Sequence, residues 1–177
     1  RDCLLSRGLG DVYKRQEFIE TRVKRPDSIA TKLKKKHLPI SVESVRSNLN
    51  DVAGVRVICA FLDDIYKVAD MLTAQDDVEL IKTKDYIKKP KMNGYRSLHL
   101  IISVPVYFSD HKEQIRVEVQ IRTIAMDFWA SLEHQVKYKK NVKDAESVMY
   151  ELRACADVIN RTDCHMQSIR DRIVEID

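Results

Sequence analysis

The stretch SLHLIISVPVYFSDHKEQIRVEVQIRT, residues 97–123, decides the fold. Its first ten residues form an apolar and β-branched run that suits a buried strand. Its last ten residues, 114–123, alternate between apolar and polar side chains. The polar segment between them has the length of a hairpin link. The stretch therefore predicts two consecutive strands, at 97–106 and 114–123.

The flanking sequence alternates between strand and helix patterns. It predicts strands at 53–62 and 78–87, and helices at 28–36, 63–75, 124–140 and 144–176. The expected buried face of the helix at 124–140 consists of Ile124, Phe128, Leu132 and Val136. The expected buried face of the last helix consists of Val148, Leu152, Cys155, Ile159, Met166, Ile169, Ile173 and Ile176. This order predicts an α/β (α+β) fold, with a mixed sheet of about five strands and helices packed on it.

Composition and length narrow the class of protein. A chain of 177 residues with 44% hydrophobic residues suits one domain with a sizeable core. The four cysteines form no C-x-x-C pair, which is typical of free thiols in a reducing compartment. No apolar run approaches the length of a membrane span, and no signal peptide is visible. We therefore expect a cytoplasmic protein without a membrane segment.

The first sixteen residues, RDCLLSRGLGDVYKRQ, differ in character from the rest. They hold two of the four glycines and resemble translated sequencing-adapter read-through. We expect residues 1–16 to be non-native, residues 17–143 to form the catalytic domain, and residues 144–177 to form a C-terminal helix. That helix is expected to pack on the domain or on a partner subunit.

Positive charge is concentrated in two segments, although the net charge is only +4. Residues 22–36 and 82–96 are both rich in lysine and arginine. Such clusters in a chain of nearly balanced charge indicate two anionic groups bound at defined places. A solvated lysine surface is the ordinary alternative for each cluster.

Two carboxylates stand where a metal could bind. Glu118, Gln120 and Arg122 share one face of the strand at 114–123. This polar face either is exposed to solvent, as on an edge strand, or forms the floor of a binding site. Asp51 precedes the strand at 53–62, as a turn residue or as a ligand. Because Mg²⁺ takes one or two carboxylates together with substrate phosphates, Asp51 and Glu118 would suit it if their strands are neighbours.

The segment before the strand at 97–106 carries the second basic cluster together with aromatic residues. Tyrosine rings stack on bases, and lysines and arginines neutralise phosphates. His99 shares a strand face with Ser97 and Ile101, so it is either a structural histidine or faces the same cleft as Glu118. The residues that this segment and its strand contribute are Lys84, Tyr86, Lys91, Tyr95, Arg96 and His99. The chain has neither a P-loop nor a G-x-G-x-x-G motif, so side chains would have to hold any phosphates.

Four segments together resemble the RelA/SpoT-type small alarmone synthetases. They are TRVKRPDSIATKLKKK, DVAGVRVICAFLDDIYKVADML, DYIKKPKMNGYRSLHL and VEVQIRTIAMDFWASLEHQVKYK, and the likeness spans roughly residues 17 to 175. The resemblance implies a nucleotidyltransferase-like fold and a Mg²⁺-dependent GTP pyrophosphokinase of the stringent response. Such enzymes move the pyrophosphoryl group of ATP to the ribose 3′-OH of GDP or GTP and release AMP. The family's tetramers imply a homo-oligomer, and the absence of a His-Asp dipeptide implies synthesis without hydrolysis.

The resemblance also implies roles for individual residues. For ATP they are Arg22 and Arg56 around the adenine, and Lys24, Ser28, Lys32 and Lys34 on the phosphates. For Mg²⁺ they are Asp51 and Glu118, with Glu118 also drawing the proton from the 3′-OH and Arg56 completing the catalytic set. For the acceptor, Tyr95 would stack on the guanine and Asp127 would lie near the base. The acceptor's phosphates would be held by Lys84, Lys91 and His99, with Tyr86 and Arg96 beside them. Gln120 and Arg122 would brace the cleft. Lys84 and Asp127 depart from family members that carry Arg and Asn at these places.

Two other functions fit part of the pattern. A non-catalytic module that binds guanine nucleotide or single-stranded RNA would also use basic loops and tyrosines. It would have no need of two carboxylates in an anion site. A different nucleotidyltransferase on the same fold would usually need a third carboxylate or a closely spaced pair such as D-x-D. The only nearby pair is Asp63 with Asp64, which suits a helix N-terminus.

Overall fold

The computed structural model describes residues 16–138 and 145–174. A five-stranded sheet has the order β1-β2-β5-β4-β3, in which only β2 and β5 run parallel. The strands are β1 (Gln16–Val23), β2 (Ala53–Cys59), β3 (Glu79–Asp85), β4 (Leu98–Tyr107) and β5 (Lys112–Thr123). The helices are α2 (Pro26–Lys35), α3 (Val42–Asn48), α4 (Leu62–Thr73), α5 (Ile124–Tyr138) and α6 (Ala145–Val174). The predicted mixed α+β fold with a long C-terminal helix is confirmed.

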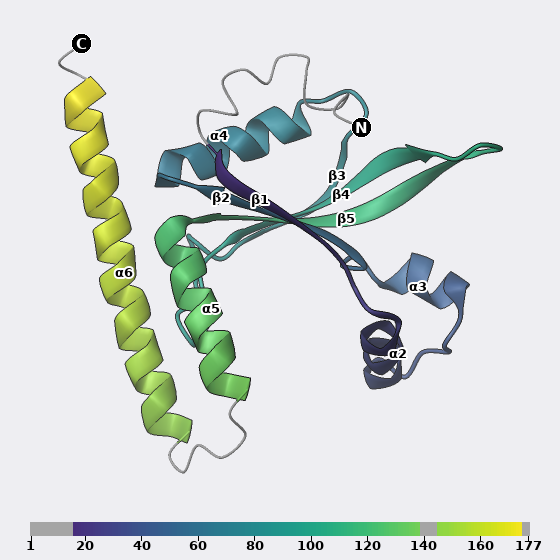
Figure 1. The fold of residues 1–177 in the computed structure, drawn as a ribbon, viewed down its shortest axis with the longest axis horizontal. Helices are drawn as coiled ribbons and strands as arrows, with labels where there is room; N and C mark the ends of the chain where they lie inside the picture. Colours follow the sequence, from purple (N-terminus) through teal and green to yellow (C-terminus); the bar gives the residue numbers. More distant parts are fainter. Residues whose placement is uncertain (1–15, 139–144, 175–177) are drawn as a thin grey trace.

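The sheet has one apolar face and one polar face, which separates the core from the site. Strand alternation directs Val57 of β2, Leu100 of β4, and Val119 and Ile121 of β5 to the same side. There they pack with Ile65 of α4, which lies on one side of the sheet in Figure 1. The opposite face of the same strands carries the polar side chains described below.

Two elements were not predicted from the sequence. β1 pairs with β2 in antiparallel register and forms one edge of the sheet. The sequence-based prediction treated residues 1–16 as non-native and assigned no element between them and the helix at 28–36, whereas β1 begins at Gln16. Residues 1–15 lie outside the described part of the chain. α3 is short, with seven residues, and none of them is fully buried. A short helix without a buried face gives little apolar periodicity to detect in the sequence. Its start is capped by Ser41, whose hydroxyl accepts from the Ser44 amide at 3.1 Å.

The predicted buried face of α5 is wrong. Ile124, Phe128 and Leu132 are 53%, 59% and 42% exposed, and α5 instead buries Met126 and Trp129. The indole of Trp129 also donates a hydrogen bond to the main chain of α6. α5 carries two apolar rows, and periodicity alone does not say which of them meets the core.

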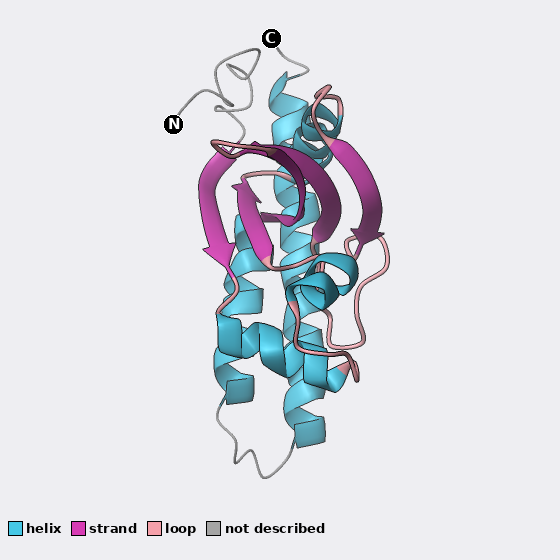
Figure 2. Ribbon diagram, turned by 90° about the vertical axis from the view of Figure 1, so that its right-hand side faces the viewer, coloured by secondary structure: helices cyan, strands magenta, loops and turns pink. Residues whose placement is uncertain are grey.

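The predicted buried face of α6 is partly wrong. Cys155, Met166 and Ile173 are exposed, whereas Ala156 and Asp163 are buried. Asp163 is buried because its carboxylate accepts from the hydroxyl of Thr123 at 2.7 Å, and that hydroxyl also accepts from the Met126 amide at the start of α5. α6 therefore packs beside α5, as Figure 1 shows, and both helices extend well past the strands in Figure 2. Ile176 lies outside the described residues.

The loop before β4 depends on one glycine. Gly94 has a φ of +88°, and a Cβ placed there would lie 2.5 Å from the Cβ of Ala156 on α6. At Gly54 in β2, an added Cβ would make only ordinary contacts, the nearest at 3.7 Å. Gly94 thus meets two demands at once, a left-handed backbone and a close approach to α6.

We predict that Gly94→Ala lowers the free energy of unfolding by about 2–4 kcal/mol, because it combines backbone strain with overpacking. Gly54→Ala, the matched control, should change it by less than about 1 kcal/mol. The check is the urea midpoint of each variant, followed by circular dichroism. Equal midpoints for the two variants would contradict the prediction.

Candidate functional site

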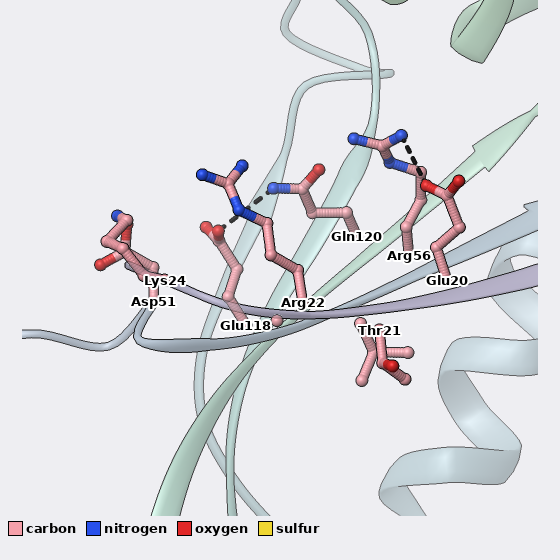
Figure 3. A pocket seen from close by; sticks show the side chains of 10 residues that line it. Glu20, Thr21, Arg22, Lys24, Asp51, Arg56, Glu118 and Gln120 are labelled. Atoms are coloured by element: carbon pink, nitrogen blue, oxygen red, sulfur yellow. Dashed lines mark hydrogen bonds and ion pairs between the residues drawn. The ribbon is translucent and has the colours of Figure 1, made fainter. Parts of the chain in front are cut away.

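A cavity of about 550 Å³ opens on the polar face of the sheet where β1, β2 and β5 lie side by side. Its lining residues are Glu20, Thr21, Arg22, Lys24, Asp51, Gly54, Val55, Arg56, Glu118 and Gln120. Figure 3 shows Arg22, Arg56, Glu118 and Gln120 projecting to one side of the strands, whereas Thr21 points to the other. The parallel pairing of β2 with β5 sets Gly54 opposite Glu118, so the strand that follows Asp51 does neighbour the strand of Glu118.

At one end of this cavity, Asp51 binds two lysines. Its Oδ2 atom accepts from Lys24 at 2.5 Å and from Lys32 of α2 at 2.6 Å. Burial would raise the pKa of Asp51, but the hydrogen bonds from both lysines outweigh it and lower the pKa below its ordinary value. Asp51 thus stays ionised and gathers two cations from separate elements. Ser28 and Lys34, also predicted on the donor side, are exposed on α2.

Glu118, Gln120 and Arg122 form the polar row that alternation in β5 predicted. Gln120 donates to Glu118 Oε2 at 3.1 Å, and Arg122 donates to Gln120 Oε1 at 2.7 Å. His99 of β4 lies 3.2 Å from the other oxygen of Glu118. The hydrogen bond from His99 lowers the pKa of Glu118, against burial and the nearby charge of Asp51, which raise it. Glu118 is therefore an ionised carboxylate held on both oxygens.

An aromatic cluster continues the site away from the cavity. The rings of Tyr86, Tyr95 and His99 meet edge to face, with centroids 5.2–6.0 Å apart. The ammonium group of Lys91 lies 4.7 Å from the Tyr86 centroid and 4.5 Å from the Tyr95 centroid. Lys84 of β3 lies opposite His99 in the register of β3 with β4. The structure thus brings five predicted acceptor residues to one place, next to Glu118.

Asp127 lies between two arginines rather than at the aromatic rings. Its Oδ1 atom accepts from Arg122 at 3.0 Å and lies 3.5 Å from Arg56. Arg56 also pairs with Glu20 of β1 at 3.0 Å. Asp127 therefore joins an arginine of the cavity to the arginine that contacts Tyr95.

The carboxylates fit a divalent cation. Asp51 Oδ1 is buried and has no hydrogen-bond partner among the described residues. Asp51 and Glu118 line the same cavity. Within residues 16–138 and 145–174, no group of three or more His, Cys, Asp or Glu side chains could hold a metal. A Mg²⁺ ion here would therefore take two carboxylates and complete its shell with phosphate oxygens and water.

Arg96 lies apart from the other predicted site residues. Its guanidinium donates to the main chain of Ala156 at 3.5 Å and to Asp157 at 3.3 Å, so it binds α6 and not the aromatic cluster. Its neighbour on the chain, Tyr95, contacts His99 through its hydroxyl at 2.8 Å, so the side chains of these two consecutive residues go to different places. In this structure Arg96 holds α6 against the loop.

Two residues of the site were missed from the sequence. Glu20 lies on the unpredicted β1, where the alternation of Glu20 and Arg22 with Ile19 and Thr21 was the available signal. Asn93 donates from its amide to Glu133 of α5 at 2.9 Å, which ties the loop before β4 to that helix. A hydrogen bond between residues 40 positions apart leaves no local pattern in the sequence from which it could be predicted.

The chain is similar to known proteins over most of its length. A family model described as a region found in RelA / SpoT proteins matches residues 21–143. GTP pyrophosphokinase YwaC of Bacillus subtilis (strain 168) is 44% identical over 157 residues, which are 89% of this chain and 75% of that protein. GTP pyrophosphokinase YjbM of the same strain is 38% identical over 160 residues, 90% of this chain and 74% of that protein.

A solved structure shows the same arrangement of elements. The crystal structure of small alarmone synthetase 1 from Bacillus subtilis, bound to its product pppGpp, matches with a TM-score of 0.81 and 37% sequence identity. The match covers 89% of this chain and 80% of that one. Since the family model spans more than half of the chain and the relatives exceed 30% identity over most of it, this chain belongs to the RelA/SpoT family.

Proposed function

We propose that this chain is a (p)ppGpp synthetase, which transfers the pyrophosphoryl group of ATP to the 3′-OH of GDP or GTP, releases AMP and acts in the stringent response. The observation that carries the proposal is the position of Glu118 between a cation-lined cavity and an aromatic cluster with lysines. The names of the two Bacillus relatives and the pppGpp bound to the solved synthetase support it.

The cavity is the ATP side of the site in this proposal. Arg22 lies opposite Gly54, and Glu20 lies opposite Arg56, so the two arginines are diagonal neighbours across β1 and β2. Guanidinium planes stack on ring faces, so this pair suits the adenine. Lys24 and Lys32 approach from the Asp51 end and bind the donor's phosphates, joined by Ser28 and Lys34 of α2.

The aromatic cluster is the acceptor side. Tyr95 stacks on the guanine, and Lys91 and Lys84 neutralise the acceptor's phosphates. Arg122 and Gln120 link this cluster to Glu118 and keep the acceptor's ribose next to the carboxylate. Asp127 accepts hydrogen bonds from the guanine, and in doing so it gives up its contact with one of its two arginine partners, Arg122 or Arg56.

The chemical step is an in-line displacement at phosphorus. Glu118 takes the proton of the 3′-OH, and the 3′-oxygen forms a bond to the β-phosphorus of ATP. The bond between the β-phosphorus and the oxygen that bridges to the α-phosphate breaks, and AMP leaves with that oxygen. When bound by Asp51 and Glu118, Mg²⁺ supplies charge neutralisation at the phosphates. Arg22, Arg56, Lys24 and Lys32 supply the remaining positive charge and the positioning.

The proposal extends to the setting of the enzyme. None of the described helices combines the length and apolar character needed to cross a bilayer. We expect the protein to act in the cytoplasm, where its nucleotide substrates are. We also expect a homo-oligomer, supported by the exposed apolar row of Ile124, Phe128 and Leu132 on α5. Synthesis without hydrolysis is expected because the sequence has no His-Asp dipeptide.

The test is direct synthesis by the purified protein. The protein is mixed with Mg²⁺, ATP labelled on its β-phosphate, and GDP or GTP in parallel, and the nucleotides are then separated. Labelled guanosine tetra- or pentaphosphate together with AMP is the expected result, and the two yields rank the acceptors. Guanine nucleotide binding without any product would instead favour the non-catalytic binding module.

Tyr95 offers a prediction specific to the acceptor. Tyr95→Ala should weaken GDP binding roughly 10- to 100-fold, because one stacked base contributes about 1–3 kcal/mol. ATP binding should change less than about threefold, and Tyr95→Phe, which keeps the ring, should bind both nucleotides nearly as the parent does. Calorimetric titrations with each nucleotide alone check this. An equal loss for ATP and GDP would remove Tyr95 from the acceptor side.

A further inference from the structure

Glu20 lies at the end of the cavity that is farthest from Asp51. Alternate residues of a strand share a face, so β1 and the position after it line the cavity in the order Glu20, Arg22, Lys24. Figure 3 shows Lys24 and Asp51 at one end of this row, Arg22 next to them, and Glu20 with Arg56 at the other end. In the proposed function the phosphates of ATP lie at the Lys24 end. The adenine therefore extends away from them, toward Glu20.

The pairing of β1 with β2 sets four positions at the corners of a square. Glu20 lies opposite Arg56, and Arg22 lies opposite Gly54. The two arginines occupy one diagonal, and diagonal neighbours on a strand pair are about 7–8 Å apart, which leaves room for one flat ring between the guanidinium groups. A ring held there extends along the other diagonal, over Gly54 and toward Glu20. Gly54 has no side chain to obstruct it.

The carboxylate of Glu20 uses one of its two oxygens within the protein. Its Oε2 atom accepts from Nη1 of Arg56 at 3.0 Å, and the side chain is 49% exposed. Asp127 lies 3.5 Å from the same Nη1 atom, so acidic groups hold Arg56 from two sides. Within residues 16–138 and 145–174, Glu20 Oε1 has no hydrogen-bond partner. A carboxylate only accepts, so Oε1 is available to an N–H group of a ligand.

Adenine carries such a group on the edge that points away from its ribose. Its exocyclic amine, at position 6, is a hydrogen-bond donor, whereas guanine has an accepting carbonyl oxygen at that position. Purine riboside has only a hydrogen atom there. The two arginines around the ring donate and cannot accept, so neither of them can bind the amine.

We propose that Glu20 is a specificity-determining residue of the donor site, whose Oε1 atom accepts a hydrogen bond from the exocyclic amine of ATP while Oε2 holds Arg56. The inference rests on the proposed function, because it needs the cavity to be the ATP side of the site. Stacking between Arg22 and Arg56 holds any purine, since every base has a ring face. Glu20 adds the contact that distinguishes adenine from purines without the amine.

The test compares ATP with purine riboside triphosphate, which differs from ATP by the amine alone. Each is titrated calorimetrically into the protein with Mg²⁺ and without acceptor. The parent should bind ATP about tenfold more tightly, the weaker end of the range for one hydrogen bond to a charged group. Glu20→Ala should reduce this ratio to about twofold or less. Glu20→Gln, whose amide oxygen still accepts from adenine, should keep a ratio of at least about fivefold.

A purely structural role for Glu20 gives a different result. If Glu20 only held Arg56, Glu20→Ala would weaken both triphosphates equally and keep the tenfold ratio, and the inference would be overturned. Equal binding of the two triphosphates by the parent would overturn it as well. Glu79→Ala is the matched control, because Glu79 is exposed on β3 at the opposite edge of the sheet and should leave the ratio unchanged. Circular dichroism verifies that each variant is folded.

Alarmone synthesis, assayed on the same preparations, separates this inference from the proposed function. A parent that prefers ATP through Glu20 but makes no alarmone would count against the proposed function alone. A parent that makes alarmone but binds both triphosphates equally would count against the role of Glu20 alone. A parent that binds neither triphosphate would count against both.

Discussion

Glu118→Gln should lower kcat for alarmone synthesis about 1,000-fold while the fold remains intact. The substitution preserves the shape of the side chain but removes the charge that accepts the 3′-OH proton, and general bases contribute typically 10²- to 10⁴-fold. It also removes one of the two carboxylates that fit Mg²⁺. The measurement is single-turnover transfer of labelled pyrophosphate at saturating ATP and GDP. Binding of both nucleotides, measured separately by calorimetry, should persist.

Glu113→Gln is the matched control on the same strand. Glu113 lies at the far end of β5, outside the cavity, and pairs with the exposed Arg46 at 2.9 Å. Exposed ion pairs contribute little, so this variant should keep synthesis within about twofold of the parent. Activity of Glu118→Gln within tenfold of the parent would show that another group takes the proton.

The lowered pKa of Glu118 also sets the direction of the pH profile. Because the carboxylate stays ionised below the ordinary glutamate value of 4.5, it contributes no loss of activity until the pH falls below that value. A fall in kcat at higher pH would need another titrating group. The profile of kcat against pH, taken with the protein shown to be folded at each point, measures this.

Asp51→Asn should lower kcat/KM for ATP about 100-fold or more. The substitution removes the charge that draws Lys24 and Lys32 together and that, through Oδ1, can ligate Mg²⁺. The concentration of Mg²⁺ at half-maximal rate should rise at least about tenfold, and the affinity for GDP alone should stay near that of the parent. An unchanged Mg²⁺ requirement would remove Asp51 from the metal site.

Asp63→Asn is the control for this variant. Asp63 lies exposed in the first turn of α4 and pairs only loosely with Lys67, at 3.7 Å. It should leave both the rate and the Mg²⁺ requirement unchanged.

Asp51 also makes a prediction about stability. Its pKa is lowered in the folded state, so its ion pairs stabilise the fold fully above the ordinary pKa of 3.8 and lose that contribution as the pH falls through the lowered value. The unfolding free energy of Asp51→Asn should therefore fall less steeply with acid below about pH 4 than that of the parent. At neutral pH the loss should be about 1 kcal/mol, because solvent screens both partly exposed lysines.

Local sequence determined the strands and helices whose pattern is strong. The apolar run at Leu98–Tyr107 and the alternation at Lys112–Thr123 each specify one conformation, because side chains of a strand point alternately to its two faces. The same alternation put Glu118, Gln120 and Arg122 in one row, which the hydrogen bonds between them confirm. The helix predicted at 28–36 is α2, which begins two residues earlier, at Pro26, because proline suits the first turn of a helix.

The sequence was misleading where two faces of an element compete. α5 and α6 are apolar on more than one side, and the row that is buried depends on hydrogen bonds between distant segments. Asp163 is buried where its carboxylate accepts a hydrogen bond from Thr123, 40 positions earlier in the chain. Trp129 is buried where its indole donates a hydrogen bond to the main chain of α6. Periodicity reports that a helix has an apolar row, but it does not report which row has a neighbour.

The chemistry of the site divides in the same way. The residue types were evident along the chain: two basic clusters, two carboxylates, and tyrosines beside a histidine. Only the tertiary structure set Asp51 and Glu118 in one cavity, through the parallel pairing of β2 with β5, and directed Arg96 to α6. The orientation of His99 between Tyr95 and Glu118 also depends on strand register. Local patterns specify which groups are present, whereas the distances between them depend on pairings that join residues far apart in the chain.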